Sequence, residues 1–232
     1  MSKLEDAIGI ANPQHPHCAT VLMLYTSGSM AGDNIKQVND GVRFFKEDVL
    51  SDELARKRVD LAVISFGEDV KTVTGFSSVE TLPDIVLDAN GSTPMGDALL
   101  LAMDMVEQRK KDYKNTGIDH YRPWIFMITD GEPTDMNYGD PKWNNVVQRV
   151  HDGEKNKKFM FFAIGVDNAN MKTLQAIASP ERPPLKLQQG KFKELFAWLS
   201  RSLQKTSCSK IGDMVALDDP TGPKGWGSVP TN

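Results

Sequence analysis

The feature that most constrains the fold of this chain is a series of short apolar runs that alternate with amphipathic segments. Each run contains few polar residues, as is typical of strands that are buried on both faces of a sheet. The runs occupy residues 20–25, 59–66, 124–129 and 159–166. Solid apolar strands separated by helices predict a parallel sheet that is covered by helices on both sides.

The segments between these runs have the spacing of helices. Between residues 35 and 49, apolar side chains recur every three or four positions and form one stripe along a helix. Further helices are predicted from Pro94 to Gly117, through 146–150, and over 171–178 and 192–203. The chain is therefore predicted to be an α/β protein with a Rossmann-like, doubly wound, mainly parallel sheet and helices on both faces.

Two shorter segments define the predicted edges of the sheet. Residues 59–66 and 70–74 flank a glycine-containing loop, which suits a β-hairpin. The second of these two segments is expected to be an antiparallel edge strand. A further short strand is expected at residues 185–187.

The length of 232 residues is enough for one domain of ordinary size. The patterned segments predict a body over residues 18–205, preceded by an N-terminal extension over 1–17. Residues 206–232 are rich in glycine and proline and are expected to form an extended tail or arm. Within that segment, residues 214–217 and Trp226 are the candidates for docking onto the body.

Charge and composition exclude several classes of protein. The net charge of −4 disfavours nucleic acid as the main partner. No apolar run is long enough for a signal peptide or a membrane span. The two cysteines, Cys18 and Cys208, are too far apart in sequence for a four-thiolate metal site. A reducing, cytoplasmic location is the resulting expectation.

Polar side chains follow two of the predicted buried strands. Ser27 and Ser29 come directly after the first strand, and Asp130 follows the strand at 124–129. Thr93 precedes a predicted helix in a third loop. Because ligands of α/β sheets bind beyond the carboxyl ends of the strands, these four residues are expected to line one pocket. Hydroxyl and carboxylate oxygens are the ligands that Mg²⁺ prefers.

Residues 18–204 resemble a von Willebrand factor type A domain, whose metal-ion-dependent adhesion site uses Asp-x-Ser-x-Ser with a distant Thr and a distant Asp. Ser27 and Ser29 match the serines, Thr93 the threonine and Asp130 the second aspartate. The resemblance implies bound Mg²⁺, or Mn²⁺ or Ca²⁺, and a protein-binding module without catalytic activity. Residues 121–126 and 196–200 are similar to the bacterial TerY-type branch, associated with tellurite resistance and stress response, which implies protein kinase and phosphatase partners.

One position departs from this motif. Tyr25 stands where the family has its first aspartate, and a phenol is neutral at neutral pH. A single matched carboxylate, Asp130, then faces the metal, so metal binding is expected to be weak or absent. The nearby carboxylates that could compensate for the missing aspartate are Asp33, Glu132 and Asp135.

Two other functions are compatible with the same residues. In a serine hydrolase, Ser27 or Ser29 would be the nucleophile, but the surrounding sequence is not Gly-x-Ser-x-Gly. In a purely structural subunit, the helices or the C-terminal arm would mediate assembly, and the degenerate site would be a relic.

Two further clusters have simple local interpretations. A second candidate metal site would consist of His15, His17 and Cys18, with Cys208 as a remote fourth ligand. A cluster of surface residues without metal is the favoured interpretation. The basic residues at 109–111, with Lys114, are interpreted as a solvated helix end that complements the helix dipole.

Overall fold

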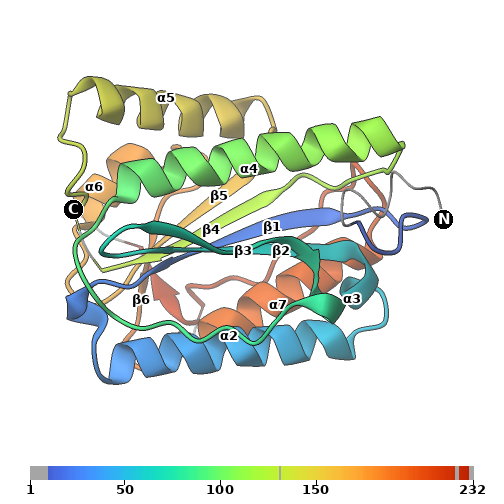
Figure 1. Ribbon diagram of the computed structural model, residues 1–232, viewed down its shortest axis with the longest axis horizontal. Coiled ribbons are helices and arrows are strands. Elements are labelled where there is room, and N and C mark those ends of the chain that lie inside the picture. Colours follow the sequence, from blue (N-terminus) through green and yellow to red (C-terminus); the bar gives the residue numbers. More distant parts are fainter. Residues whose placement is uncertain (1–9, 131, 223–224, 230–232) are drawn as a thin grey trace.

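The computed structural model of the protein describes residues 10–130, 132–222 and 225–229, so most of the predicted extension over 1–17 lies outside the described residues. A seven-stranded sheet runs through the centre in the order β3-β2-β1-β4-β5-β6-β7 (Figure 1). Its strands are β1 (Cys18–Tyr25), β2 (Val59–Phe66), β3 (Val70–Ser78), β4 (Trp124–Thr129), β5 (Met160–Gly165), β6 (Leu185–Leu187) and β7 (Gly227–Ser228).

The centre of the sheet is parallel. Strand β1 pairs in parallel with β2 on one side and with β4 on the other, and β5 and β6 continue the parallel order. At one edge, β3 pairs antiparallel with β2, as the hairpin pattern predicts. The predicted fold class is confirmed. The sequence pattern did not predict β7, which pairs antiparallel with β6 at the other edge.

Helices cover both faces of the sheet. In Figure 1, α4, α5 and α6 lie on one side of the strands, and α2, α3 and α7 lie on the other. The helices are α2 (Asp33–Ser51), α3 (Ala55–Arg58), α4 (Met95–Thr116), α5 (Pro141–Lys155), α6 (Met171–Ile177) and α7 (Phe192–Cys208), with short 3₁₀ turns η1 (Gly28–Met30) and η2 (Val79–Thr81). No helix within the described ranges has the length and apolar character that a membrane span requires.

Burial explains why the central strands are nearly continuous apolar runs. Every residue of β1, β2 and β4 is buried between the two helical layers. On the side of α2 and α7, the two helices approach closely at Gly41, where an added Cβ would lie 2.1 Å from the Phe196 ring. A glycine in a helix usually weakens it, but here it permits this contact.

The C-terminal residues pack on the domain. Helix α7 continues to Cys208, so the boundary expected at residue 205 falls inside a helix. The indole N–H of Trp198 donates to the carbonyl of Asp218 at 2.8 Å. Trp226 is only 2% exposed, and its ring lies 5.5 Å from that of Trp198. Asp218 and Trp226 thus contact the body, where an extended tail or arm was expected, whereas Met214 is fully exposed.

A buried polar network joins the sheet to α4. The Asp60 carboxylate on β2 accepts hydrogen bonds from Arg109 Nη2 at 2.7 Å and from the Tyr113 hydroxyl at 2.6 Å. His17 Nδ1 lies 3.2 Å from the other carboxylate oxygen. Arg109 is 3% exposed, so the prediction that 109–111 forms a solvated helix end is wrong for this residue. Its charge faces a buried aspartate that the helical pattern does not reveal.

Candidate functional site

The candidate site lies where the order of the strands reverses. The chain passes from β1 to β2 on one side and later returns to β4 on the other side of β1. The loops after β1 and β4 therefore diverge from the carboxyl end of the sheet, which is where α/β proteins bind ligands. Tyr25 ends β1, and Asp130 follows the last residue of β4.

Two hydroxyl contacts join pairs of motif positions. The Tyr25 hydroxyl lies 2.8 Å from Thr93 Oγ1, and Ser27 Oγ lies 2.8 Å from Ser29 Oγ. Burial raises the pKa of Asp130, and the nearby Ser29 side chain opposes that rise. Residues from three loops therefore lie at one edge of the sheet, and a pocket shared by all of them stays a prediction.

Local hydrogen bonds hold these loops together. The Ser27 side chain caps η1 by accepting from the backbone N–H of Ser29 at 3.4 Å. The Thr93 loop is tied to the loop after β4, because Thr93 N donates to Thr134 Oγ1 at 3.1 Å and Thr134 N donates to the Thr93 carbonyl at 2.8 Å. Thr134 is a positioning residue that sequence reasoning did not single out.

Tyr25 fills the position that a carboxylate would occupy in the motif. Its side chain is 4% exposed, and its ring lies 5.5 Å from that of Phe66 on the neighbouring strand. The buried ring directs the hydroxyl onto Thr93. The phenol therefore makes one hydrogen bond with the threonine that the motif resemblance assigns to the metal.

Asp130 is a half-buried carboxylate without a neutralising partner. Burial raises its pKa, the hydrogen bond from Ser29 opposes that shift, and the charge of Asp167 raises the pKa further. Its Oδ1 atom is buried and has no hydrogen-bond partner among the described residues. The site therefore contains one buried carboxylate oxygen that no hydrogen bond among the described residues satisfies.

The oxygen atoms at this site do not form the ligand set that Mg²⁺ requires. A hard divalent cation is usually held by several oxygen ligands that include carboxylates. Here Tyr25 supplies no charge, and Thr93 already contacts the phenol. Within the described residues, no group of three His, Cys, Asp or Glu side chains could hold a metal ion.

The three candidate compensating carboxylates have other partners. Asp135 accepts from the backbone N–H groups of Gly96 and Asp97 at 3.0 and 2.8 Å, at the start of α4. Glu132 accepts from the Asn170 amide. Asp33 is exposed and lies 3.7 Å from Lys36 of the same helix. In the described structure, none of the three contacts Ser27, Ser29 or Asp130 through a hydrogen bond.

Sequence reasoning missed Asp167, which acts on Asp130 through its charge. Asp167 follows β5 in a left-handed conformation with φ of 50°, and its carboxylate accepts from the Asn34 amide at 2.5 Å. The sequence contains a feature that could have identified Asp167, because this residue comes directly after the apolar run at 159–166.

The remaining candidate residues lie apart from this site. His17 is buried beside Asp60. The backbones of His17 and His120 form an isolated parallel β-bridge before the starts of β1 and β4. The ring of His151 contacts the Ala178 carbonyl at 3.0 Å. Among the described residues, no histidine hydrogen-bonds to Ser27 or Ser29, so the geometry of a serine nucleophile and its base is not formed.

The second metal hypothesis has no support among the described residues, where no group of three His, Cys, Asp or Glu side chains could hold a metal ion. Cys18 is fully buried in the core, and burial raises the pKa of its thiol to about 12. Cys208 is exposed at the end of α7. A thiol with such a high pKa is a poor metal ligand near neutral pH, because metals bind the thiolate.

Comparison with known proteins agrees with this architecture. The sequence profile of the von Willebrand factor type A domain matches residues 21–197. The fold is similar to that of the pilus adhesin SpaC from Lactobacillus rhamnosus GG, with a TM-score of 0.64 and 14% identity over 82% of this chain and 30% of SpaC. The chain thus spans about a third of that adhesin. No curated protein has a matching sequence.

Two further solved structures are similar. The von Willebrand factor domain of the type V pili tip protein Mfa5 from Porphyromonas gingivalis has a TM-score of 0.59 and 12% identity, over 87% of this chain and 99% of that domain. Proximal thread matrix protein 1 from the mussel byssus has a TM-score of 0.53 and 18% identity, over 82% and 48% of the two chains. At these identities the likeness shows the fold alone. Because the profile covers most of its sequence, this chain belongs to the von Willebrand factor type A domain family.

Proposed function

We propose that this protein is a non-catalytic protein-interaction module that binds its partner at the edge formed by Ser27, Ser29, Thr93 and Asp130. The observation that carries the proposal is that the loops holding these residues lie together at one edge of the sheet, since Tyr25 contacts Thr93 and Thr134 ties the Thr93 loop to the loop after β4. From the resemblance to the TerY-type branch, the expected setting is a cytoplasmic stress-response system with kinase or phosphatase partners.

Recognition at this edge is proposed to depend little on metal. Tyr25 removes one carboxylate from the motif and contacts Thr93. The half-buried Asp130 carboxylate and the nearby charge of Asp167 favour a basic group on the partner.

Calorimetric titration with Mg²⁺ and with Mn²⁺ tests the metal part of the proposal. The protein and Tyr25→Phe, which keeps the ring without adding a carboxylate, are expected to show no binding. Tyr25→Asp is expected to bind, because it restores the missing ligand. Tight binding by the unaltered protein would contradict the proposed loss of metal affinity. If none of the three proteins binds metal, the metal-site motif does not explain the residues at this edge.

The interaction itself is tested by cross-linking partners in cells and identifying them by mass spectrometry. Asp130→Asn is expected to abolish capture of a specific partner. Asp104→Asn, which removes an exposed carboxylate from α4, serves as a matched control and is expected to preserve capture. Equal capture by both variants would favour the assembly-only alternative, in which this edge is a relic.

A further inference from the structure

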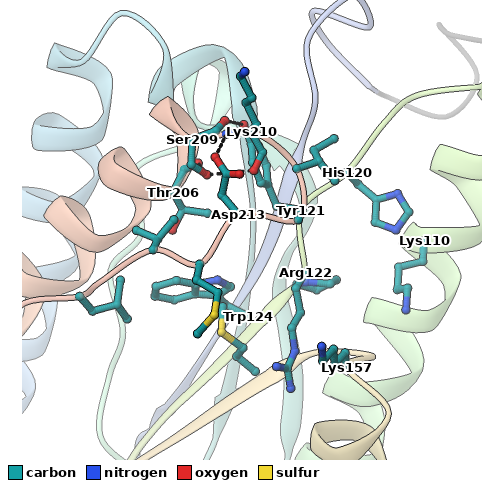
Figure 2. A pocket seen from close by; sticks show the side chains of 17 residues that line it. Lys110, His120, Tyr121, Arg122, Trp124, Lys157, Thr206, Ser209, Lys210 and Asp213 are labelled. Carbon is teal, nitrogen blue, oxygen red and sulfur yellow. Dashed lines mark hydrogen bonds between the residues drawn. The ribbon is translucent and has the colours of Figure 1, made fainter.

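A second concave site lies at the opposite end of the sheet. A cavity of about 590 Å³ lies where β4 and β5 begin (Figure 2). Its walls come from α4, from the segment before β4, from the turn after α5 and from residues 209–217. The motif residues follow the other ends of β1 and β4, so this cavity is distinct from the proposed partner-binding edge.

One side of the cavity is apolar. Trp124 and Met160 line it at the starts of β4 and β5, and Pro123 precedes them. Across from them, the segment after α7 contributes Ile211 and Met214, which are 47% and 101% exposed. Large apolar side chains at the mouth of a concave site are typical of places where a ligand covers them.

The Trp124 indole gives the cavity an unused hydrogen-bond donor. Trp124 is fully buried, and its Nε1 atom has no hydrogen-bond partner among the described residues. A buried indole N–H normally finds an acceptor. Trp124 also lines the cavity, so this unsatisfied polar group lies in its wall.

The other side of the cavity carries positive charge. Four lysine and arginine side chains line it together with His120, and Figure 2 shows Lys110, Arg122 and Lys157 across from the chain that carries Ser209 and Asp213. The lining cations are Lys110, Arg122, Lys157 and Lys210. Among the described lining residues, only Asp213 carries a carboxylate, and it accepts from the backbone N–H of Lys210 at 2.9 Å.

These cations are incompletely neutralised. Arg122 pairs with Glu154 at 2.6 Å, whereas Lys110, Lys157 and Lys210 form no ion pair within the described part of the chain. Burial lowers the pKa of Lys110, and the charges of Lys114 and Lys158 lower it further. The local potential therefore favours a bound anion.

We propose that this cavity binds a small organic anion with an apolar body, such as a medium-chain carboxylate. The carboxylate lies against Lys110, Lys157 and Arg122, and the apolar body lies against Trp124, Met160 and Met214. The volume falls in the usual range for small-molecule sites. The binding of such a ligand would also cover the exposed apolar side chains of residues 211 and 214.

The test uses decanoate as the probe and displacement of 8-anilinonaphthalene-1-sulfonate fluorescence as the readout. Decyltrimethylammonium, which has the same chain length and the opposite charge, is the matched ligand control. Decanoate is expected to displace the dye, and the cation is not. Equal displacement by both compounds, or by neither, would overturn the proposal.

Variants of adjacent lysines locate the site. Lys110→Gln is expected to weaken decanoate binding by about fivefold, and the double variant Lys110→Gln/Lys157→Gln by about twenty-fold, since each removes one unpaired cation. Lys111→Gln removes an exposed neighbour that does not line the cavity, and its affinity should be unchanged. Unchanged affinity in the double variant would place the anion elsewhere and refute the assignment.

Discussion

Replacement of Arg109 by methionine tests whether the buried network of β2 and α4 contributes to stability. Arg109 donates to one oxygen of Asp60 through Nε at 3.2 Å and Nη2 at 2.7 Å. Both side chains are at most 4% exposed. Methionine retains most of the apolar stem of arginine, so the change removes mainly the charge and its donors.

The size of the effect follows from what remains around Asp60. Breaking a buried ion pair by removing one partner costs about 3–5 kcal/mol, because the other charge stays buried. Tyr113 still donates to Asp60 at 2.6 Å, and His17 lies beside its other oxygen. We therefore expect Arg109→Met to lower the free energy of unfolding by about 3 kcal/mol, the lower end of that range.

Urea denaturation followed by circular dichroism measures this change. Lys111→Met, on the exposed face of the same helix, is the matched control and is expected to change stability by less than about 0.5 kcal/mol. The double variant Asp60→Asn/Arg109→Met removes both charges, so neither is left buried without the other. Its loss of unfolding free energy should therefore be smaller than the sum of the losses in the two single variants. A loss below about 1 kcal/mol for Arg109→Met would refute the reasoning.

Three further predictions concern other features. Burial by itself would raise the pKa of Asp60, but its hydrogen-bonding neighbours hold the pKa below the ordinary value. The stabilising contribution of Asp60 is therefore present above about pH 4 and is lost as the pH falls through the folded-state pKa. In urea titrations at several pH values, Asp60→Asn should therefore reduce the loss of stability that accompanies acidification. Trp226→Ala should cost about 2–4 kcal/mol in thermal or urea unfolding, because it removes a buried ring that packs on Trp198; no loss would mean that the C-terminal segment is not part of the fold. In native protein at pH 8, iodoacetamide should modify the exposed Cys208 within minutes and Cys18 only after unfolding, as mass spectrometry would show.

The sequence by itself determined the type and order of most elements. Solid apolar runs identified β1, β2, β4 and β5, because strands buried on both faces tolerate few polar residues. The three-and-four spacing of apolar residues between 35 and 49 identified α2. The order of Ser27, Ser29, Thr93 and Asp130 along the chain also predicted that their loops lie at one edge of the sheet, and the pocket shared by all four stays a prediction.

Local sequence could not determine the contacts that depend on distant residues. Arg109 looks like part of a solvated basic helix end, and only the position of Asp60 on β2 explains its burial. The same holds for the C-terminal segment, whose glycines and prolines suggest an arm, whereas Trp226 packs on Trp198 and Gly227 pairs with β6.

The candidate site shows the same division. The sequence suggested that Tyr25 occupies a motif position, whereas its hydroxyl contact with Thr93 and the effect of the Asp167 charge on the pKa of Asp130 depend on the tertiary structure. The physical reason is that side-chain spacing along the chain reports which face of an element is apolar. Which distant side chains share a hydrogen bond or a charge is set by how the packed layers bring the loops together.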